Sequence, residues 1–179
     1  MLRIYKTEDS GKLAKLKKNK IIPATWCSLI NPNEEELLQV SSFLRVDYDL
    51  LSNSLDADER SRIEQEKNSL AIIINLPLLD DEDNFDTLPC GIVLTAKNLI
   101  TICARDNRVL NSFNRSTAHT FDTRNRARFL LNILYRCTQF YLRYLNIINR
   151  RTEQIEYALR KTTSNKELFQ LMEIQKSLV

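Results

Sequence analysis

The sequence is poor in the residues that form most phosphate-binding loops and metal centres. It contains two glycines, Gly11 and Gly91, whereas Walker and dinucleotide-binding loops need two or three closely spaced glycines. The single histidine, His119, excludes multi-histidine metal sites and zincin helices. The cysteines form no C-x-x-C pair, which excludes zinc-ribbon and thioredoxin motifs and favours buried thiols of a cytosolic protein. They are Cys27, Cys90, Cys103 and Cys137.

Long apolar runs are also lacking. The longest, Leu70–Ile74, is far shorter than the about 20 residues that a membrane span needs. Met1–Lys6 has no apolar core of a signal peptide. Of the 179 residues, 43% are hydrophobic and 27% are charged, which is ordinary for one soluble domain with or without an appendage.

Charge is segregated along the chain, although the net charge is only +3. Between Asn33 and Asp86, fifteen acidic residues oppose four basic ones; between Arg124 and Lys161, nine basic residues oppose two acidic ones. A third cluster consists of lysines within Lys12–Lys20. Such segregation either steers subunits or partners together or leaves solvated faces without a partner. The sequence leaves both interpretations open.

Six segments with alternating or β-favouring residues are predicted to be strands. They are Leu2–Lys6, Thr25–Ile30, Ser61–Asn68, Leu70–Leu79, Leu88–Thr95 and Leu99–Cys103. The polar alternation of the third predicts an edge strand, and the apolar fourth predicts a central strand. We predict a hairpin turn at Lys97-Asn98, a surface loop over Asp80–Asn84, and a turn or flexible segment over the lysine-rich Thr7–Lys20.

Short helices are predicted after Asn33, over Asp47–Leu55 and over Arg108–Asn114. Asn33 suits an N-cap because Glu36 follows three residues later and acidic side chains fill the first turn. These features also fix where the first of the helices begins.

The C-terminal part carries the strongest structural signal. Apolar residues recur at three- and four-residue steps over Arg124–Lys161, which predicts a helix about 55 Å long at about 1.5 Å per residue. A second helical pattern follows Thr162–Asn165 and is incomplete at Val179. We interpret this end as a cut within a helix, because no capping residue closes it.

None of the candidate chemical motifs supports an enzyme. Ser116, His119 and Asp122 lie close in sequence, but a local trio without a nucleophile elbow favours a surface histidine. Asp80–Asp83 lacks the alternating ligands, turn glycine and closing glutamate of a calcium loop. We therefore predict a solvated loop there, with at most weak Mg²⁺ or Ca²⁺ binding, and no catalytic residue or tightly bound cofactor in the chain.

The remaining motifs favour structural roles. The cluster Lys12–Lys20 lacks the interleaved aromatic residues of a nucleic-acid platform, so we predict a mobile basic connection rather than a nucleic-acid or acidic-lipid site. Phe140, Tyr141 and Tyr144 are predicted to be helix-packing surface. We therefore predict no nucleic-acid partner.

The order of the segments indicates a family. In this sequence the segments follow in a fixed order. They are Trp26 on a strand, Asn31–Glu36 opening a helix, Leu51–Leu55, Arg60–Glu64, an apolar strand that ends in Asn75-Leu76-Pro77, Leu94–Ile102, and Arg126–Leu131 within the long helix. This arrangement resembles the cytosolic N-terminal region of CorA-type magnesium transporters over about Pro23–Val179. The family's most specific mark, Gly-Met-Asn at the end of the first membrane helix, is expected beyond Val179.

The resemblance implies a mixed α/β fold, with a β-sheet sandwiched between helices and followed by a very long stalk helix. It implies a cytosolic α/β/α domain over residues 1–122, and the stalk helix with the start of the next helix over residues 123–179. It also implies a homopentamer in the cell membrane, with this domain on the cytoplasmic side in a regulatory and architectural role. Mg²⁺ or Co²⁺ is the implied transported ion and a candidate regulatory ion, while Ni²⁺ and Zn²⁺ stay open as cargo.

Two departures from the family pattern affect its expected sites. Where members often have Trp-hydrophobic-Asp, this chain has Trp26-Cys27-Ser28. Some members bind regulatory Mg²⁺ between a Glu-Asp pair of the second short helix and an Asp of a neighbouring stalk helix; the matching positions here are Ser52, Asn53 and Arg136. An arginine without carboxylates disfavours a cation, so the metal ligands stay unknown. Either gating uses other acids, such as Asp47, Asp49 or Asp56, or this domain is not gated by Mg²⁺ in that way.

Three alternatives stay open from the residues alone. One is a stand-alone soluble scaffold or interaction protein with a coiled-coil-like arm, whose natural end lies near Val179. Another is a nucleic-acid module that uses the arginine-rich helix and binds with steep salt dependence. The third is a hydrolase that uses His119.

Overall fold

The computed structural model describes residues 1–79, 84–161 and 165–176. One mixed sheet of seven strands forms its centre, in the spatial order β2-β1-β3-β7-β6-β5-β4. The strands are β1 (Leu2–Thr7), β2 (Leu13–Leu16), β3 (Thr25–Ile30), β4 (Arg62–Gln65), β5 (Ser69–Leu79), β6 (Phe85–Thr95) and β7 (Leu99–Cys103). Strands β3 and β7 pair in parallel, and the other neighbours pair antiparallel.

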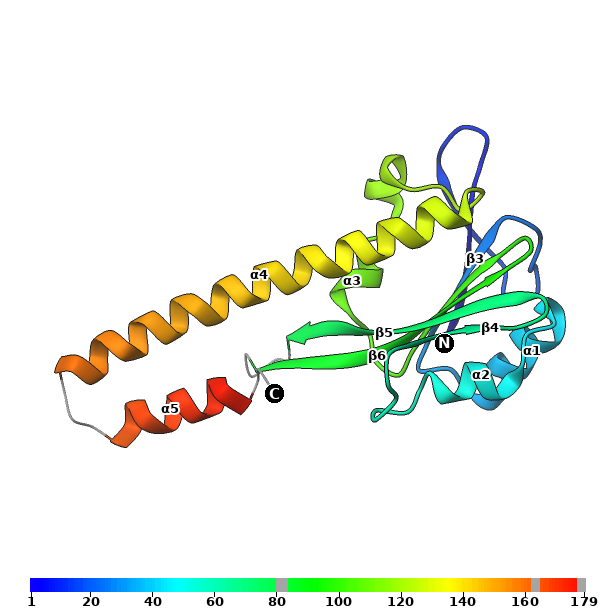
Figure 1. The fold of residues 1–179 in the computed structure, drawn as a ribbon. Coiled ribbons are helices and arrows are strands. Elements are labelled where there is room, and N and C mark those ends of the chain that lie inside the picture. Colours follow the sequence, from blue (N-terminus) through cyan, green and yellow to red (C-terminus); the bar gives the residue numbers. More distant parts are fainter. Residues whose placement is uncertain (80–83, 162–164, 177–179) are drawn as a thin grey trace.

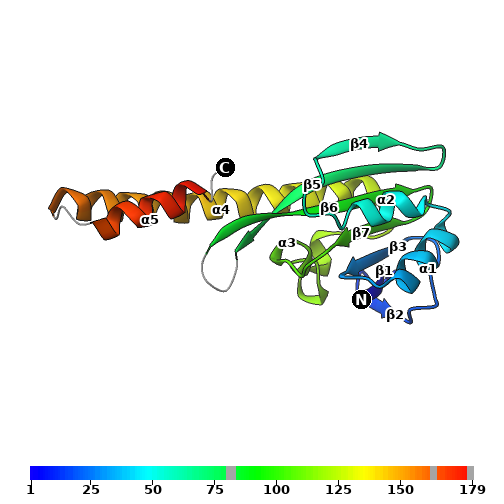
Figure 2. The ribbon, with the colours of Figure 1, turned by 90° about the horizontal axis from the view of Figure 1, so that it is seen from below.

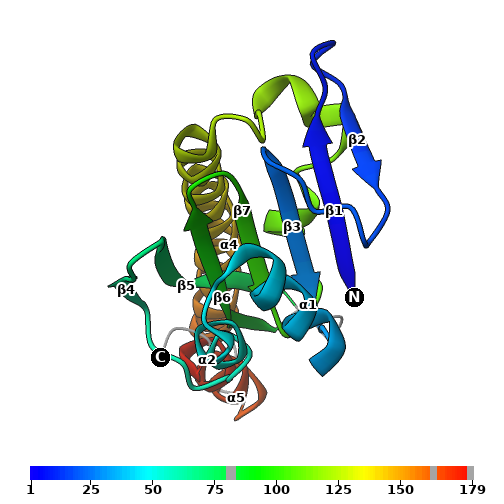
Figure 3. The ribbon, with the colours of Figure 1, turned by 90° about the vertical axis from the view of Figure 1, so that its right-hand side faces the viewer.

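Helices cover both faces of this sheet, and one of them is very long. They are α1 (Glu34–Leu44), α2 (Tyr48–Asn53), α3 (Arg108–Asn111), the 3-10 helix η1 (Arg115–Thr120), α4 (Arg126–Lys161) and α5 (Asn165–Lys176). Helices α1 and α2 lie on one face, while α3 and α4 lie on the other (Figures 1 and 3). Figure 2 shows α4 running past the end of the sheet, with α5 returning beside its far end. The predicted fold class, a mixed sheet between helices followed by a very long helix, is confirmed.

Most predicted elements are present, and their ends follow local capping. Asn33 accepts a hydrogen bond from the backbone N–H of Glu36 at 2.9 Å, and Asp47 accepts one from that of Asp49 at 3.0 Å. The helix predicted over Arg108–Asn114 is shorter, because Asn114 instead caps η1 by accepting from Ser116. The division of the chain at residues 122 and 123 stays a prediction.

The segment Thr7–Lys20 was the main error among the predicted elements. It contains the strand β2, which pairs antiparallel with β1 in the register Ile4↔Leu16. Leu13 is buried in the core. The burial of this side chain and the pairing with β1 stabilise a strand here, although the segment is rich in lysine. The predicted edge strand is confirmed as β4. Strand β5 is interior but next to that edge, and most of the predicted loop Asp80–Asn84 lies outside the described residues.

The sheet separates two apolar layers. On the α4 face, Trp26 is surrounded by Phe113, Phe121 and Phe129, with edge-on ring contacts of 5.1–6.4 Å between centroids. The Trp26 indole N–H donates to the Thr101 hydroxyl at 2.9 Å, which satisfies the buried polar atom of the ring. On the opposite face, α1 and α2 bury an aliphatic layer. It includes Leu37, Val40, Leu50, Leu51, Ile100 and Ile102.

Helix α2 approaches the sheet closely at Gly91 of β6. A Cβ atom at Gly91 would lie 2.7 Å from the Cβ of Ser54, the C-cap of α2, and would also overlap the Ser54 hydroxyl oxygen. Glycine is therefore needed here because the Ser54 side chain lies against the Gly91 backbone, and not because of an unusual φ.

We predict that Gly91→Ala lowers the free energy of unfolding by about 1–3 kcal/mol, because the added methyl group overpacks this contact. Urea unfolding followed by circular dichroism measures the loss. Ser54→Gly in the same chain should recover most of it, with Ser54→Gly alone as the control. An unchanged unfolding midpoint for Gly91→Ala would contradict the close packing of α2 on β6.

Candidate functional site in the long helix

One face of α4 is a packing face that fixes the helix to the sheet. Its buried residues recur at four- and seven-residue steps: Phe129, Ile133, Cys137, Tyr144 and Ile148. Such steps place side chains on one side of a helix. The helix is therefore held along its first six turns and not only at its start.

Aromatic residues extend this packing face to the far end of the β5–β6 hairpin. The Tyr141 hydroxyl donates to the Asn75 carbonyl at 2.9 Å. The Tyr144 ring lies 5.6 Å from Phe85 between centroids, and the guanidinium of Arg151 lies 5.3 Å from the centroid of the same Phe85 ring. The prediction that Tyr141 and Tyr144 form helix-packing surface agrees with these contacts.

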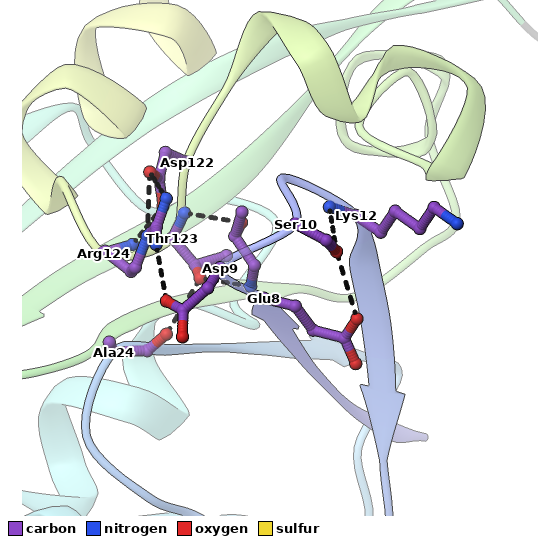
Figure 4. A network of polar contacts seen from close by, with 9 residues as sticks. Glu8, Asp9, Ser10, Lys12, Ala24, Asp122, Thr123 and Arg124 are labelled. Carbon is purple, nitrogen blue, oxygen red and sulfur yellow. Dashed lines mark hydrogen bonds and ion pairs between the residues drawn. The ribbon is translucent and has the colours of Figure 1, made fainter.

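The start of α4 is tied to the β1–β2 hairpin by a buried pair of threonines. The Thr7 backbone N–H donates to the Thr123 hydroxyl oxygen at 2.8 Å, and the Thr123 N–H donates to the Thr7 hydroxyl oxygen at 3.1 Å. The Thr123 hydroxyl in turn donates to the Ala24 carbonyl at 2.8 Å. Figure 4 shows Thr123 reaching toward Ala24 within this network.

An arginine completes the junction on its exposed side. Arg124 pairs with Asp122 at 2.8 Å and with Asp9 at 3.1 Å, which links the α4 start to the β1–β2 turn (Figure 4). The hydrogen bond from Arg124 lowers the pKa of Asp122 below its ordinary value. Because these groups lie near solvent, the threonine pair contributes more to the junction than the ion pairs do.

A second face of α4 is apolar and exposed. Leu131, Tyr135, Leu142 and Leu145 are 64%, 63%, 52% and 42% exposed. Their steps of four, seven and three residues match the a and d spacing of a helix–helix seam. Leu145 belongs to the apolar pattern that predicts the helix, and the structure places it in this exposed row. Such a row of large apolar side chains on one helix marks an interaction surface.

A third face of α4 is basic. Residues 126–152 contain six arginines and no acidic residue. Arg136, Arg143 and Arg150 follow one another at steps of seven residues, and none forms an ion pair with an acidic residue in the described part of the chain. Helix α4 therefore has a packing face, an apolar exposed face and a basic face.

The residues weighed for catalysis are not assembled into a relay. The Ser116 hydroxyl donates to Asn114 at 2.6 Å, and Asp122 is held by Arg124. His119 is exposed and borders a cleft of about 300 Å³ with Asp122 and Arg124. Among the hydrogen bonds of the described residues, none joins Ser116, His119 and Asp122 to one another.

The cysteines are buried, as predicted. Burial raises the pKa of Cys27 to about 12 and that of Cys137 to about 11, so these thiols stay protonated and unreactive at neutral pH. In the described residues, no group of three or more histidine, cysteine, aspartate or glutamate side chains is arranged to hold a metal ion. Asp80–Asp83 lies outside the described residues.

Ser52, Asn53 and Arg136 are distant within one chain. Ser52 and Asn53 end α2 on one face of the sheet, whereas Arg136 lies on α4 on the other face (Figure 3). The Ser52 hydroxyl donates to the Asp49 carbonyl at 3.1 Å. A site made from both helices would require two copies of the chain, and the metal ligands stay a prediction.

The comparisons with known proteins agree with this architecture. The model of the CorA-like Mg²⁺ transporter protein family matches residues 24–179. The chain belongs to this family. A comparison with curated proteins gave no match. The family resemblance inferred from the order of segments is confirmed.

Solved structures of the family share the fold. The complete CorA magnesium transporter from Methanocaldococcus jannaschii is 21% identical with a TM-score of 0.86, over 99% of this chain and 57% of that chain. The soluble domain of the same CorA is 22% identical with a TM-score of 0.80, over 99% and 72%. The ZntB cytoplasmic domain from Vibrio parahaemolyticus RIMD 2210633 is 14% identical with a TM-score of 0.75, over 98% and 70%.

The chain thus spans 57% of the length of the complete CorA that it resembles. Across the described residues, every helix is too short or too polar to cross a bilayer. The fold of the described residues matches that of the soluble domain of CorA.

We predict that Thr123→Val destabilises this CorA-like chain by about 1–3 kcal/mol, because the buried N–H of Thr7 and the Ala24 carbonyl lose their partner. Urea unfolding measures the change. Thr120→Val, at an exposed position of η1, is the matched control and should change stability by less than about 0.5 kcal/mol. Equal effects of the two substitutions would contradict a junction held by Thr7 and Thr123.

Proposed function

We propose that this chain is the regulatory and architectural part, on the cytoplasmic side, of a divalent-cation transporter of the cell membrane. Mg²⁺ is the proposed cargo, with Co²⁺ as the main alternative. The observation that carries the proposal is the family match over residues 24–179, together with the CorA-like course of α4 beyond the sheet. The role is not catalytic, and the pore residues that move the ion lie outside this chain.

We further propose that the full-length protein is a homopentamer in which α4 acts as the stalk helix. The exposed row of Leu131, Tyr135, Leu142 and Leu145 supports this proposal, because an a/d-spaced row buries its apolar area against another helix. The sheet-facing row of α4 is already occupied by the core. The exposed row is therefore available for a second copy.

The rigid attachment of α4 supports a regulatory role. A 36-residue helix spans about 54 Å at about 1.5 Å per residue, and its first part is packed on the sheet and tied by Thr7 and Thr123. Small rotations at the sheet would therefore be carried along the helix to its far end. This arrangement suits a domain in which a change of orientation at the sheet moves the far end of α4, toward a distant pore.

Expression of the complete reading frame that encodes this chain tests the transport function. In a bacterial strain unable to import Mg²⁺, the complete protein should restore growth at low Mg²⁺, and purified protein in vesicles should admit Mg²⁺ down its gradient. The 179-residue chain alone is the control and should do neither. A reading frame that ends near Val179, or a longer protein that admits neither Mg²⁺ nor Co²⁺, would contradict the proposal and leave a soluble scaffold.

A further inference from the structure

Two adjoining clefts lie between the β1–β2 turn and the segment that leads into α4. The cleft of about 300 Å³ is bordered by η1 and the start of α4, and a second cleft of about 590 Å³ is bordered by residues 8–14 and η1. Gly11, Ala118 and His119 border both. We call the two clefts together the junction groove, and their volumes are in the range of small-molecule sites.

Basic side chains without a partner border the junction groove from three separate segments. Lys12 comes from the β1–β2 turn, Arg115 and His119 come from η1, and Arg128 comes from the first turn of α4. All four are exposed. Within the described residues, none of these side chains takes part in a salt bridge or a hydrogen bond. Their donors are therefore available to a ligand.

The acidic side chains of the groove do not neutralise these groups. Asp122 is already held by Arg124 at 2.8 Å. The Glu8 carboxylate accepts a hydrogen bond from the Ser10 hydroxyl at 3.4 Å. Four lysine or arginine side chains thus border the two clefts, against two carboxylates. The excess of positive charge favours an anion.

We propose that the junction groove binds a small anion that carries two or more linked phosphate groups. Guanidinium groups bind phosphate oxygens with paired hydrogen bonds, and each cleft has its own arginine, Arg115 in one and Arg128 in the other. In Figure 4, Lys12 and Arg124 lie on opposite sides of the β1–β2 turn. Linked phosphates can therefore reach basic groups in both clefts, whereas a single phosphate occupies one.

The lining of the groove favours recognition of the phosphates themselves. Phe121 is the aromatic ring that borders it, and this ring is only 4% exposed because it packs in the core. A nucleotide base needs an accessible ring on which to stack. The shared chemistry of the ligand is thus a pyrophosphate or triphosphate group, either free or as part of a nucleotide.

Such a ligand would contact both sides of the junction that Thr7 and Thr123 hold together. A ligand that binds only the folded state stabilises that state, so its binding would strengthen the attachment of α4 to the β1–β2 hairpin. The effect on regulation rests on the proposed function. Binding of the anion does not depend on it.

Calorimetric titration of the untagged 179-residue chain tests the proposal with defined anions. Tripolyphosphate should bind at least about tenfold more tightly than inorganic phosphate or citrate, because it adds charge-assisted hydrogen bonds. ATP distinguishes the two sources of the phosphate chain. Affinity for ATP equal to that for tripolyphosphate assigns a nucleotide, and weaker binding of ATP assigns an inorganic polyphosphate.

Matched variants locate the site. Arg115→Gln with Arg128→Gln should weaken tripolyphosphate binding about tenfold or more. The control removes the same charge from the arginine row of α4, which consists of Arg136, Arg143 and Arg150. Arg143→Gln with Arg150→Gln should change binding less than about twofold, because these groups are more than a Debye length from the groove. Glu8→Gln should tighten binding, because it removes a like charge.

The single histidine gives an independent readout. Because His119 is the only histidine, the untagged chain has one set of imidazole C–H signals in its proton NMR spectrum. Tripolyphosphate should shift these signals in a saturable way, with the midpoint found by calorimetry. If the double variant in the groove fails to fold by circular dichroism, Lys12→Gln replaces it and should weaken binding by itself.

The proposal is overturned if tripolyphosphate gives no saturable binding at about 1 mM, if the groove and control variants lose affinity equally, or if the His119 signals do not move. None of these results bears on the transport function, because ion entry is measured on the complete protein in vesicles. Loss of ion entry with anion binding intact would overturn the transport function and leave the phosphate site in place.

Discussion

The packing of one face of α4 on the aromatic cluster around Trp26 sets the orientation of the long helix on the sheet. Phe129 and Trp26 are almost fully buried, and their rings meet edge-on at 5.1 Å. This contact fixes where the long helix starts. It also fixes the rotation of α4 about its own axis, and so decides which side of the helix faces the sheet. All other properties of α4, including which side chains stay exposed, follow from that rotation.

Once the packing face is fixed, the periodicity of the helix assigns the remaining faces. At about 100° per residue, the apolar row and the arginine row lie at different positions around the helix, so they point toward neighbouring molecules in different directions. The sheet also separates the acidic helix α2 from the basic helix α4. Within one chain the acidic and the basic region cannot pair with each other. Both therefore stay available for contacts between copies.

The sequence predicted most of the architecture because the signals were local. Asn33 caps its helix as predicted, the helix predicted from Asp47 begins directly after that residue, and the β-favouring segments became strands. The strand β2 was missed because its pairing depends on β1 and on the buried Leu13, which composition does not reveal. The exposed apolar row of α4 was not predicted, because helical periodicity shows that a face is apolar and does not show whether the sheet extends far enough to cover it.

The candidate site was less predictable than the fold. Thr7 and Thr123 are 116 positions apart, and two ordinary threonines carry no sequence signal for a mutual contact. The arginine spacing of seven residues was visible in the sequence, but its meaning required knowing which face of α4 the core occupies. The family resemblance was carried by segment order, and the family match over residues 24–179 agrees with it.

Interspin distances between identical copies are the sharpest test of the proposed closed ring, in which α4 brings the copies together. Gln139 is exposed on α4, and the four cysteines of this chain are buried, so Gln139→Cys provides one accessible labelling position within this chain, and any accessible cysteine elsewhere in the complete protein is replaced by serine. A five-membered ring predicts two interspin distances in a ratio of about 1.6. A single distance, as in a symmetric dimer, or the absence of any defined distance would contradict the claim.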